Sequence, residues 1–218
     1  MRIVLLLALL VTLPALGQSL SLSPIEAQVL SELNFARTEP QRYAREVLEP
    51  MRAHFRGTEI VEPPWRTRKP GVVQVVETQE GVQALEEAID AMKAAQPVPA
   101  LTPSYGLTLA ARAYRKEQAK QGRIGHIGQD GSTPADRIER FGRWEGVAGE
   151  NLFYGDGDVQ VGRFVVMALI IDDGVADRGH RHTIMEAGYT LVGIAFGPHP
   201  LYGGLCVQNF AAEFYDAP

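Results

Sequence analysis

Apolar side chains recur at spacings of three and four residues in several segments, a pattern typical of amphipathic helices. The first segment follows Ser23-Pro24-Ile25-Glu26, where serine and glutamate match a capping box and proline fits the first helical position. A second, short helix is predicted from Pro40. Further helices are predicted within residues 82–92, 107–122, 133–142 and 161–169. Gly122 and Gly142 are the expected stop signals of two of them.

Three other segments have strand-like patterns. Residues 147–153 form one, and the runs 191–196 and 205–210 are joined by a loop rich in proline and glycine, which predicts a hairpin. The predicted fold class is therefore α+β, with helices packed on a small, mainly antiparallel sheet. Residues 54–80 contain Pro63-Pro64 and Lys69-Pro70-Gly71. They are predicted to be an irregular connection that can be shortened without loss of the fold.

The amino-terminal residues have the pattern of a signal peptide. Met1-Arg2 gives a positive start, residues 3–13 are almost entirely apolar, and Ala15-Leu16-Gly17 matches a small-x-small cleavage site. We expect removal of residues 1–17, which leaves residues 18–218 as a single domain; the alternative is an uncleaved membrane anchor. No other segment approaches the roughly 20 apolar residues of a transmembrane helix. The expected location is therefore secreted, periplasmic or cell-envelope, with no transmembrane segment in the mature chain.

Composition narrows the class of protein further. Apolar residues make up 45% of the chain and charged residues 22%, which is typical of a globular protein. The formal net charge is −5 and no basic run is present, so a nucleic-acid partner is not expected. Cys206 is the single cysteine, which excludes an intramolecular disulfide. Because it lies in a strand-like run, we expect a buried, inert thiol.

Candidate chemistry is concentrated in residues 125–182. This stretch contains His126 in a glycine-rich turn, Glu150 between glycine and asparagine, Asp172 after a helical segment, and His180 in Gly-His-Arg-His. Neutral histidine and carboxylate are ordinary ligands of a metal site and ordinary groups of acid–base catalysis. Each residue alone also has a structural explanation, so the argument depends on whether the fold brings them together.

The positions of Asp172 and His182 add to this picture. Asp172 lies 11 residues after Val161 and continues the apolar stripe of that helix, so its side chain is predicted to point inward and to need a partner. The alternative is a helix end frayed into solvent. His180 and His182 are two residues apart and face different directions on a helix. No serine-hydrolase elbow, Cys-x-x-Cys pair or phosphate-binding loop is present, and Ser132 is explained as a cap of the following helix.

Taken in order, several motifs resemble those of the CAP superfamily of cysteine-rich secretory, antigen 5 and pathogenesis-related 1 proteins, or SCP-like extracellular proteins, and especially its disulfide-free bacterial branch. The motifs are Leu33-Asn34-Phe35-Ala36-Arg37 with Pro40, Leu109-Ala110-Ala111, His126-Ile127-Gly128-Gln129-Asp130-Gly131-Ser132, Gly149-Glu150-Asn151-Leu152, Gly179-His180-Arg181 with Ile184-Met185, Val192-Gly193-Ile194-Ala195 and Gln208-Asn209-Phe210. The resemblance covers about residues 25–45 and 100–212; residues 46–99 exceed the usual family connection.

The resemblance implies an α-β-α sandwich with a central antiparallel sheet and a large surface cleft lined by two histidines and two acids. On this chain the histidines are His126 and His180, and one acid is Glu150. The other acid is commonly a glutamate just after a tryptophan on the long helix. Here Leu169 is at the tryptophan-like position and Asp172 stands where the glutamate would be, so this corner departs from the family pattern.

Three functions remain open at this point. The cleft could bind a small ligand, such as a lipid, a glycan or a cell-wall fragment. It could instead be a zinc-dependent, hydrolase-like site, with His126 and His180 as zinc ligands and Glu150 and Asp172 orienting them or holding a water. A third possibility is a structural network in which the four residues fix the loops by hydrogen bonds. The sequence names neither a ligand nor an activity.

Overall fold

The computed structural model describes residues 21–217. The predicted signal peptide, residues 1–17, lies outside the described residues. A four-stranded sheet forms the middle layer, in the order β4-β6-β7-β5. Its strands are β4 (Thr102–Pro103), β5 (Gly142–Tyr154), β6 (Leu191–His199) and β7 (Gly203–Asp216). The short β4 pairs parallel to β6, whereas β6, β7 and β5 pair antiparallel.

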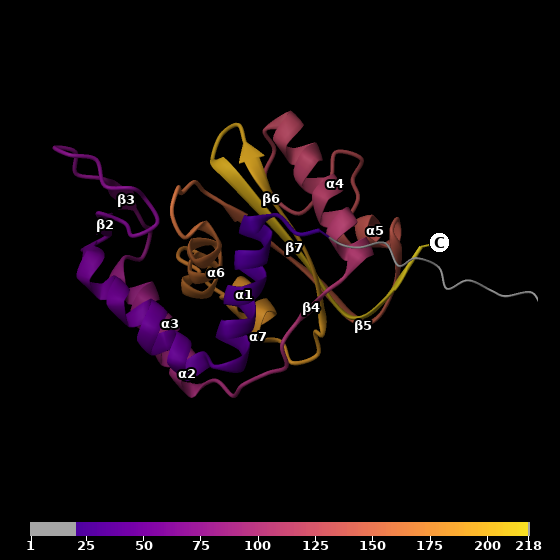
Figure 1. Ribbon diagram of the computed structural model, residues 1–218, viewed down its shortest axis with the longest axis horizontal. Helices are drawn as coiled ribbons and strands as arrows, with labels where there is room; N and C mark the ends of the chain where they lie inside the picture. The colour runs from indigo at the N-terminus through magenta and orange to yellow at the C-terminus, as the bar shows by residue number, and fades with distance from the viewer. Residues whose placement is uncertain (1–20, 218) are drawn as a thin grey trace, which may run out of the picture.

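Helices cover both faces of this sheet. One face carries α4 and α5, and the helices α1, α2, α3, α6 and α7 lie on the other side (Figure 1). This arrangement confirms the predicted α+β class and the α-β-α sandwich. The helices are α1 (Pro24–Thr38), α2 (Pro40–Tyr43), α3 (Val82–Ala94), α4 (Tyr105–Gln121), α5 (Pro134–Glu139), α6 (Val161–Ile171) and α7 (Gly179–Met185), with a π-helical turn at Ala44–Leu48 and a 3-10 turn at Glu49–His54 after α2.

Local sequence signals explain most helix ends. The Ser23–Glu26 capping box is present at the start of α1, as predicted. Gly122 ends α4 in the left-handed conformation, with a φ of 63°. The cap of α5 is Thr133, which forms a capping box with Asp136, so the expectation that Ser132 caps this helix is wrong. Threonine one residue later supplies the hydroxyl at the position where the backbone enters the helix.

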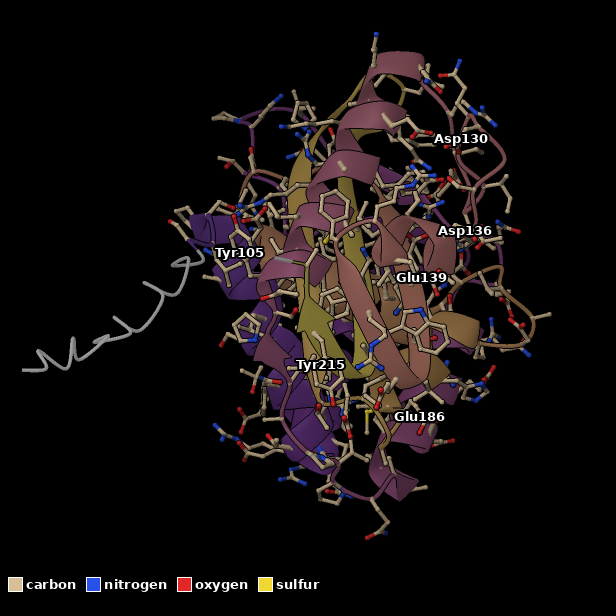
Figure 2. The ribbon with its side chains drawn as sticks, turned by 90° about the vertical axis from the view of Figure 1, so that its right-hand side faces the viewer. Tyr105, Asp130, Asp136, Glu139, Glu186 and Tyr215 are labelled. Carbon is tan, nitrogen blue, oxygen red and sulfur yellow. The ribbon has the colours of Figure 1, made fainter. Side chains whose placement is uncertain are left out.

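The view in Figure 2 faces α4 and α5. Asp136 and Glu139 of α5, both labelled there, have exposed side chains. Arg137 lies between them in sequence but is buried, with only 4% of its surface exposed. The outer face of the short helix α5 is therefore charged and exposed to solvent, whereas the side chain of Arg137 is buried in the protein.

Residues 54–80 differ from the prediction of an irregular connection. They contain a small antiparallel sheet of β1 (Phe55–Arg56), β2 (Glu59–Val61) and β3 (Val75–Glu77). Trp65, between β2 and β3, is 3% exposed and stacks on Phe164 of α6 at a ring distance of 4.0 Å. Strands of two or three residues are too short to give a visible alternation, and the prolines concealed the packing of this segment on the core.

The carboxyl-terminal hairpin is confirmed, because β6 and β7 pair antiparallel from Leu191 with Ala211 to His199 with Gly203. Cys206 on β7 is fully buried, as expected. Val165 and Ile170 of α6 are also fully buried and belong to the large core between the sheet and the helices on the α1 side. Among residues 21–217, no helix has both the length and the apolar character needed to cross a bilayer.

Candidate functional site

A cleft of about 290 Å³ lies where the loop after α4, the strand β5 and the start of α7 meet. It brings together three of the four candidate residues, which come from separate parts of the chain. The fourth, Asp172, lies behind His180 and outside the lining. The cleft is lined by His126, Glu150, Asn151, Val175, Asp177, Gly179, His180 and Thr183.

The first histidine is fixed by a carboxylate on β5. Nδ1 of His126 lies 2.9 Å from Oε1 of Glu150. The Glu150 side chain is 1% exposed, whereas the His126 side chain is 43% exposed. The buried acid therefore holds one edge of the ring, and the other edge remains accessible from the cleft.

Glu150 is in turn held by buried partners. The Arg137 guanidinium donates to both Glu150 oxygens, at 2.9 and 2.8 Å, and also donates to the backbone carbonyl of His126 at 2.8 Å. Cζ of Arg137 lies over the ring of Tyr114, 3.4 Å from the ring centroid. Asn209 satisfies its neighbours best with its amide nitrogen toward Glu150, to which it then donates at 3.2 Å. One arginine thus fixes both the acid and the backbone of the histidine that the acid orients.

The second histidine has the same kind of partner from a different element. Nδ1 of His180 lies 2.6 Å from Oδ1 of Asp172, and Oδ2 of Asp172 accepts from the His180 backbone amide at 2.9 Å. Asp172 is 3% exposed, so the alternative of a frayed, solvated helix end is wrong. It caps α6 in the left-handed conformation, with a φ of 58°, which turns its side chain toward α7.

Two arginines join the ends of α6 and α7. Arg181 donates to the carbonyls of Ile170 and Ile171, at 2.6 and 3.2 Å, and Arg178 donates to that of Asp172 at 2.8 Å. These bonds satisfy carbonyl groups that the end of a helix leaves without partners. Arg178 also pairs with Glu80 through two bonds of 2.7 Å, and this pairing lowers the pKa of Glu80 to about 2. The helix that carries His180 is thereby anchored to the segment before α3.

Both imidazoles present the same atom to the cleft. A carboxylate only accepts hydrogen bonds, so each Nδ1–H donates and each Nε2 retains its lone pair in the neutral ring. The His180 side chain is 23% exposed, which leaves its far edge accessible. His182 is exposed and is not among the residues that line the cleft, in agreement with the different directions of the two side chains. The site thus contains two oriented acceptor nitrogens.

The donor set fits a metal ion only in part. A histidine whose Nδ1–H bonds a buried carboxylate is the usual arrangement behind a zinc ligand. However, a zinc site usually has three or four protein ligands. Within residues 21–217, no group of three or more histidine, cysteine, aspartate or glutamate side chains is placed to hold a metal. The cleft therefore offers two histidine nitrogens, fewer than a zinc site usually has, and the carboxylates bond the inner nitrogens of the two rings.

Sequence reasoning missed the supporting residues. Arg137, Asn209 and Arg178 fix the candidate side chains but lie in other segments. Asn209 belongs to the Gln208-Asn209-Phe210 motif, whose pattern indicates a strand and not a contact with Glu150. Arg137 directly precedes the buried Ile138, and only its distant partner Glu150 explains why an arginine is buried there.

Comparison with known proteins places the chain in a family. The model of the cysteine-rich secretory protein family, CAP, matches residues 56–210. This match includes residues 56–99, which the motif resemblance had left outside the family pattern, so that part of the expectation is wrong. The family-model match begins at residue 56, so it does not include the Leu33–Arg37 motif, which is part of the resemblance. No curated protein sequence shows a significant match to the chain.

Two solved structures show a remote similarity. One is an extracellular protein with an SCP domain from Bacillus anthracis str. Ames, at 20% identity and a TM-score of 0.41; the match covers 53% of this chain and 35% of that one. The other is an outer surface protein from Borrelia burgdorferi, at 18% identity and a TM-score of 0.44, with 52% of this chain and 78% of that one covered. This chain thus spans about a third of the Bacillus protein. Because the family model matches well over half of the 218 residues, the protein belongs to the cysteine-rich secretory protein family, CAP.

Proposed function

We propose that this protein acts outside the cytoplasm, as a secreted or cell-envelope protein that binds a small polar ligand between His126 and His180. One observation carries the proposal: two histidines, held by two separate buried carboxylates, line the same cleft. Orienting two rings in this way is costly, because each buried acid needs partners of its own. A ligand site explains why the exposed edges of both rings are free of protein partners among the described residues.

The chemistry of the lining favours a ligand rich in hydroxyl groups. Two Nε2 acceptors match two hydroxyl donors, and Asn151, Asp177 and Thr183 add further polar groups along the cleft. Val175 is the one large apolar side chain of the lining, so an alkyl chain would find little to contact. A glycan or cell-wall fragment therefore fits this cleft better than a lipid does.

The location follows from two features of the sequence. The amino-terminal charge–apolar–small pattern predicts export, and the family is named for secreted members. A ligand from the cell wall would be available in that location. Amino-terminal sequencing of exported protein should begin at Gln18, and full-length protein retained in the cytoplasm would contradict this part of the proposal.

A zinc-dependent, hydrolase-like site is the second candidate. The carboxylate behind each histidine favours it, because such pairs orient the ring and raise the basicity of the ligand nitrogen. When bound, the ion would supply a Lewis acid for hydrolysis. In this reading, His126 and His180 hold the ion, while Glu150 and Asp172 orient the rings. Zinc affinity should fall as the pH is lowered, since protons compete for the ligand nitrogens.

Calorimetry on matched histidine variants tests both candidates. Binding of chitotetraose, a soluble hydroxyl-rich glycan, and of zinc should be measured on the protein without a histidine tag. We expect His126→Ala and His180→Ala to weaken glycan binding at least tenfold and His182→Ala to leave it unchanged. Zinc binding that depends on the same two residues, without glycan binding, would favour the second candidate. Equal effects of His180→Ala and His182→Ala would contradict both.

A further inference from the structure

A second hollow, on another part of the molecule, is lined mainly by apolar and aromatic side chains. It has a volume of about 260 Å³ and lies between α6, the end of β5 and the small sheet of β1, β2 and β3. None of its lining residues lines the histidine cleft. It therefore needs an explanation of its own.

Aromatic rings form one wall of this cavity. Trp65 and Phe164 stack with a ring distance of 4.0 Å and an interplanar angle of 4°. Phe153 meets Phe164 edge to face at 5.0 Å. All three rings line the cavity, so this wall is a continuous aromatic surface held by ring–ring packing.

The opposite wall comes from the small sheet. Ile60 of β2 and Val76 of β3 are paired across the sheet, and both line the cavity. The loop that connects β2 and β3 projects from the body of the protein (Figure 1). It carries Val72 and Val73, which are 52% and 71% exposed. These two valines are exposed apolar residues, but they are not part of the cavity lining.

The polar residues of the lining determine the charge that a ligand can carry. They are Glu77, Thr78, Tyr154 and Asp173, and the lining contains no lysine, arginine or histidine. The Asp173 carboxylate accepts from the amides of Gln79 and Glu80, at 2.7 and 2.8 Å. An anionic head group would meet two carboxylates and no cation, which disfavours it.

We propose that this cavity binds the alkyl chain of an uncharged, single-chain amphiphile, with its hydroxyl group at the Thr78–Asp173 side. The volume lies just below the roughly 300–1,000 Å³ of small-molecule pockets, which fits one chain rather than a multi-chain lipid. The walls are apolar, so burial of the chain supplies the driving force. The Asp173 carboxylate accepts a bond from the hydroxyl, whereas both lining carboxylates, Glu77 and Asp173, repel a fatty-acid head group.

Trp65 provides the readout. The chain has two tryptophans, so Trp144→Phe leaves Trp65 as the single one. In this background, titration with 1-decanol below its solubility limit should give a saturable change in Trp65 emission. Decanoate should bind at least tenfold more weakly. Ala168→Phe, which fills the cavity from α6, should abolish the response, whereas Ala94→Phe at an exposed position on α3 should retain it.

A variant that changes only the charge of the lining tests the proposal without filling the cavity. Glu77→Gln removes one carboxylate from the lining and should raise decanoate affinity severalfold while leaving 1-decanol binding unchanged. Each variant is checked for cooperative unfolding, and Ala168→Leu replaces Ala168→Phe where that check fails. The proposal is overturned by no saturable response to 1-decanol, by decanoate binding as tightly as the alcohol, or by full binding in the filled variant.

Discussion

Nδ1 of His180 lies 2.6 Å from Oδ1 of Asp172, although the two residues come from the beginning of one helix and the end of another. The pair of His126 and Glu150 repeats this relationship at 2.9 Å with a loop and a strand. In both, a buried acid holds the inner nitrogen of a partly exposed ring. The same arrangement therefore occurs twice around one cleft.

Arg137 should be essential for the stability of the first pair. Removing it leaves the 1% exposed Glu150 carboxylate without its cation, so Arg137→Met should lower the free energy of unfolding by about 3–5 kcal/mol. Arg140, on the next turn of chain, pairs with Asp130, and both side chains are about half exposed. Arg140→Met should therefore change stability by less than about 1 kcal/mol. Denaturant unfolding measures both, and equal losses would show that burial of the ion pair is not what matters.

The ion pair of Glu80 with Arg178 should make stability depend on pH. Hydrogen bonds from Arg178 lower the pKa of Glu80 from 4.5 to about 2. The folded state therefore binds the proton less readily than the unfolded chain, and the pair stabilises the fold above pH 4.5. This stabilisation is lost as the pH falls from 4.5 toward 2.

Glu80→Gln should accordingly lower the free energy of unfolding at pH 6, and its difference from the parent protein should shrink across that acidic window. Glu139→Gln, at an exposed position on α5, is the matched control and should show little difference at any pH. Unfolding curves collected at several pH values decide the matter. A difference that grows on acidification would have the wrong sign for this account.

Cys206 should be unreactive while the protein is folded. Burial raises the pKa of its thiol to about 12, so almost no thiolate exists at pH 8. Labelling by a thiol reagent should be on the order of 1,000-fold slower in the folded protein than in guanidinium. Rapid stoichiometric labelling of the folded protein, with unfolding excluded by circular dichroism, would show that the β7 strand is accessible.

Mutations in residues 54–80 should have unequal effects on the free energy of unfolding. Trp65 is buried against Phe164, so Trp65→Ala should cost about 3–5 kcal/mol of unfolding free energy. The turn at Pro70 and Gly71 is exposed, and deletion of these two residues should cost less than about 1 kcal/mol. We therefore expect that the segment can be shortened at this turn but not at the buried Trp65. Similar losses from both changes would place the turn in the core as well.

The features that were predictable from sequence are those with local causes. The capping box at Ser23, the stop at Gly122 and the hairpin after Leu191 depend on residues close to one another in the chain. The inward direction of Asp172 was also predictable, because its position continues the buried stripe of α6. Hydrophobic periodicity, together with cap and turn residues, predicts these features without knowledge of the tertiary structure.

The features that were missed depend on distant partners. Arg137 is buried because Glu150 and Tyr114 receive its guanidinium, and neither residue is close to it in sequence. The small sheet of β1, β2 and β3 has strands of two or three residues, and its stability comes from packing on α6 rather than from its own pattern. The apolar cavity follows from that packing, so it was not visible in the sequence either.

The central claim is that His126 and His180 act together as the ligand-binding groups of one cleft. Nitrogen-15 NMR of the histidine rings, during titration with chitotetraose, tests it most directly. The account predicts that both rings carry the proton on Nδ1, and that both Nε2 resonances shift with one common affinity while those of His182 stay in place. A proton on Nε2 of either ring, or a shift at His182 without one at His126 and His180, would contradict it.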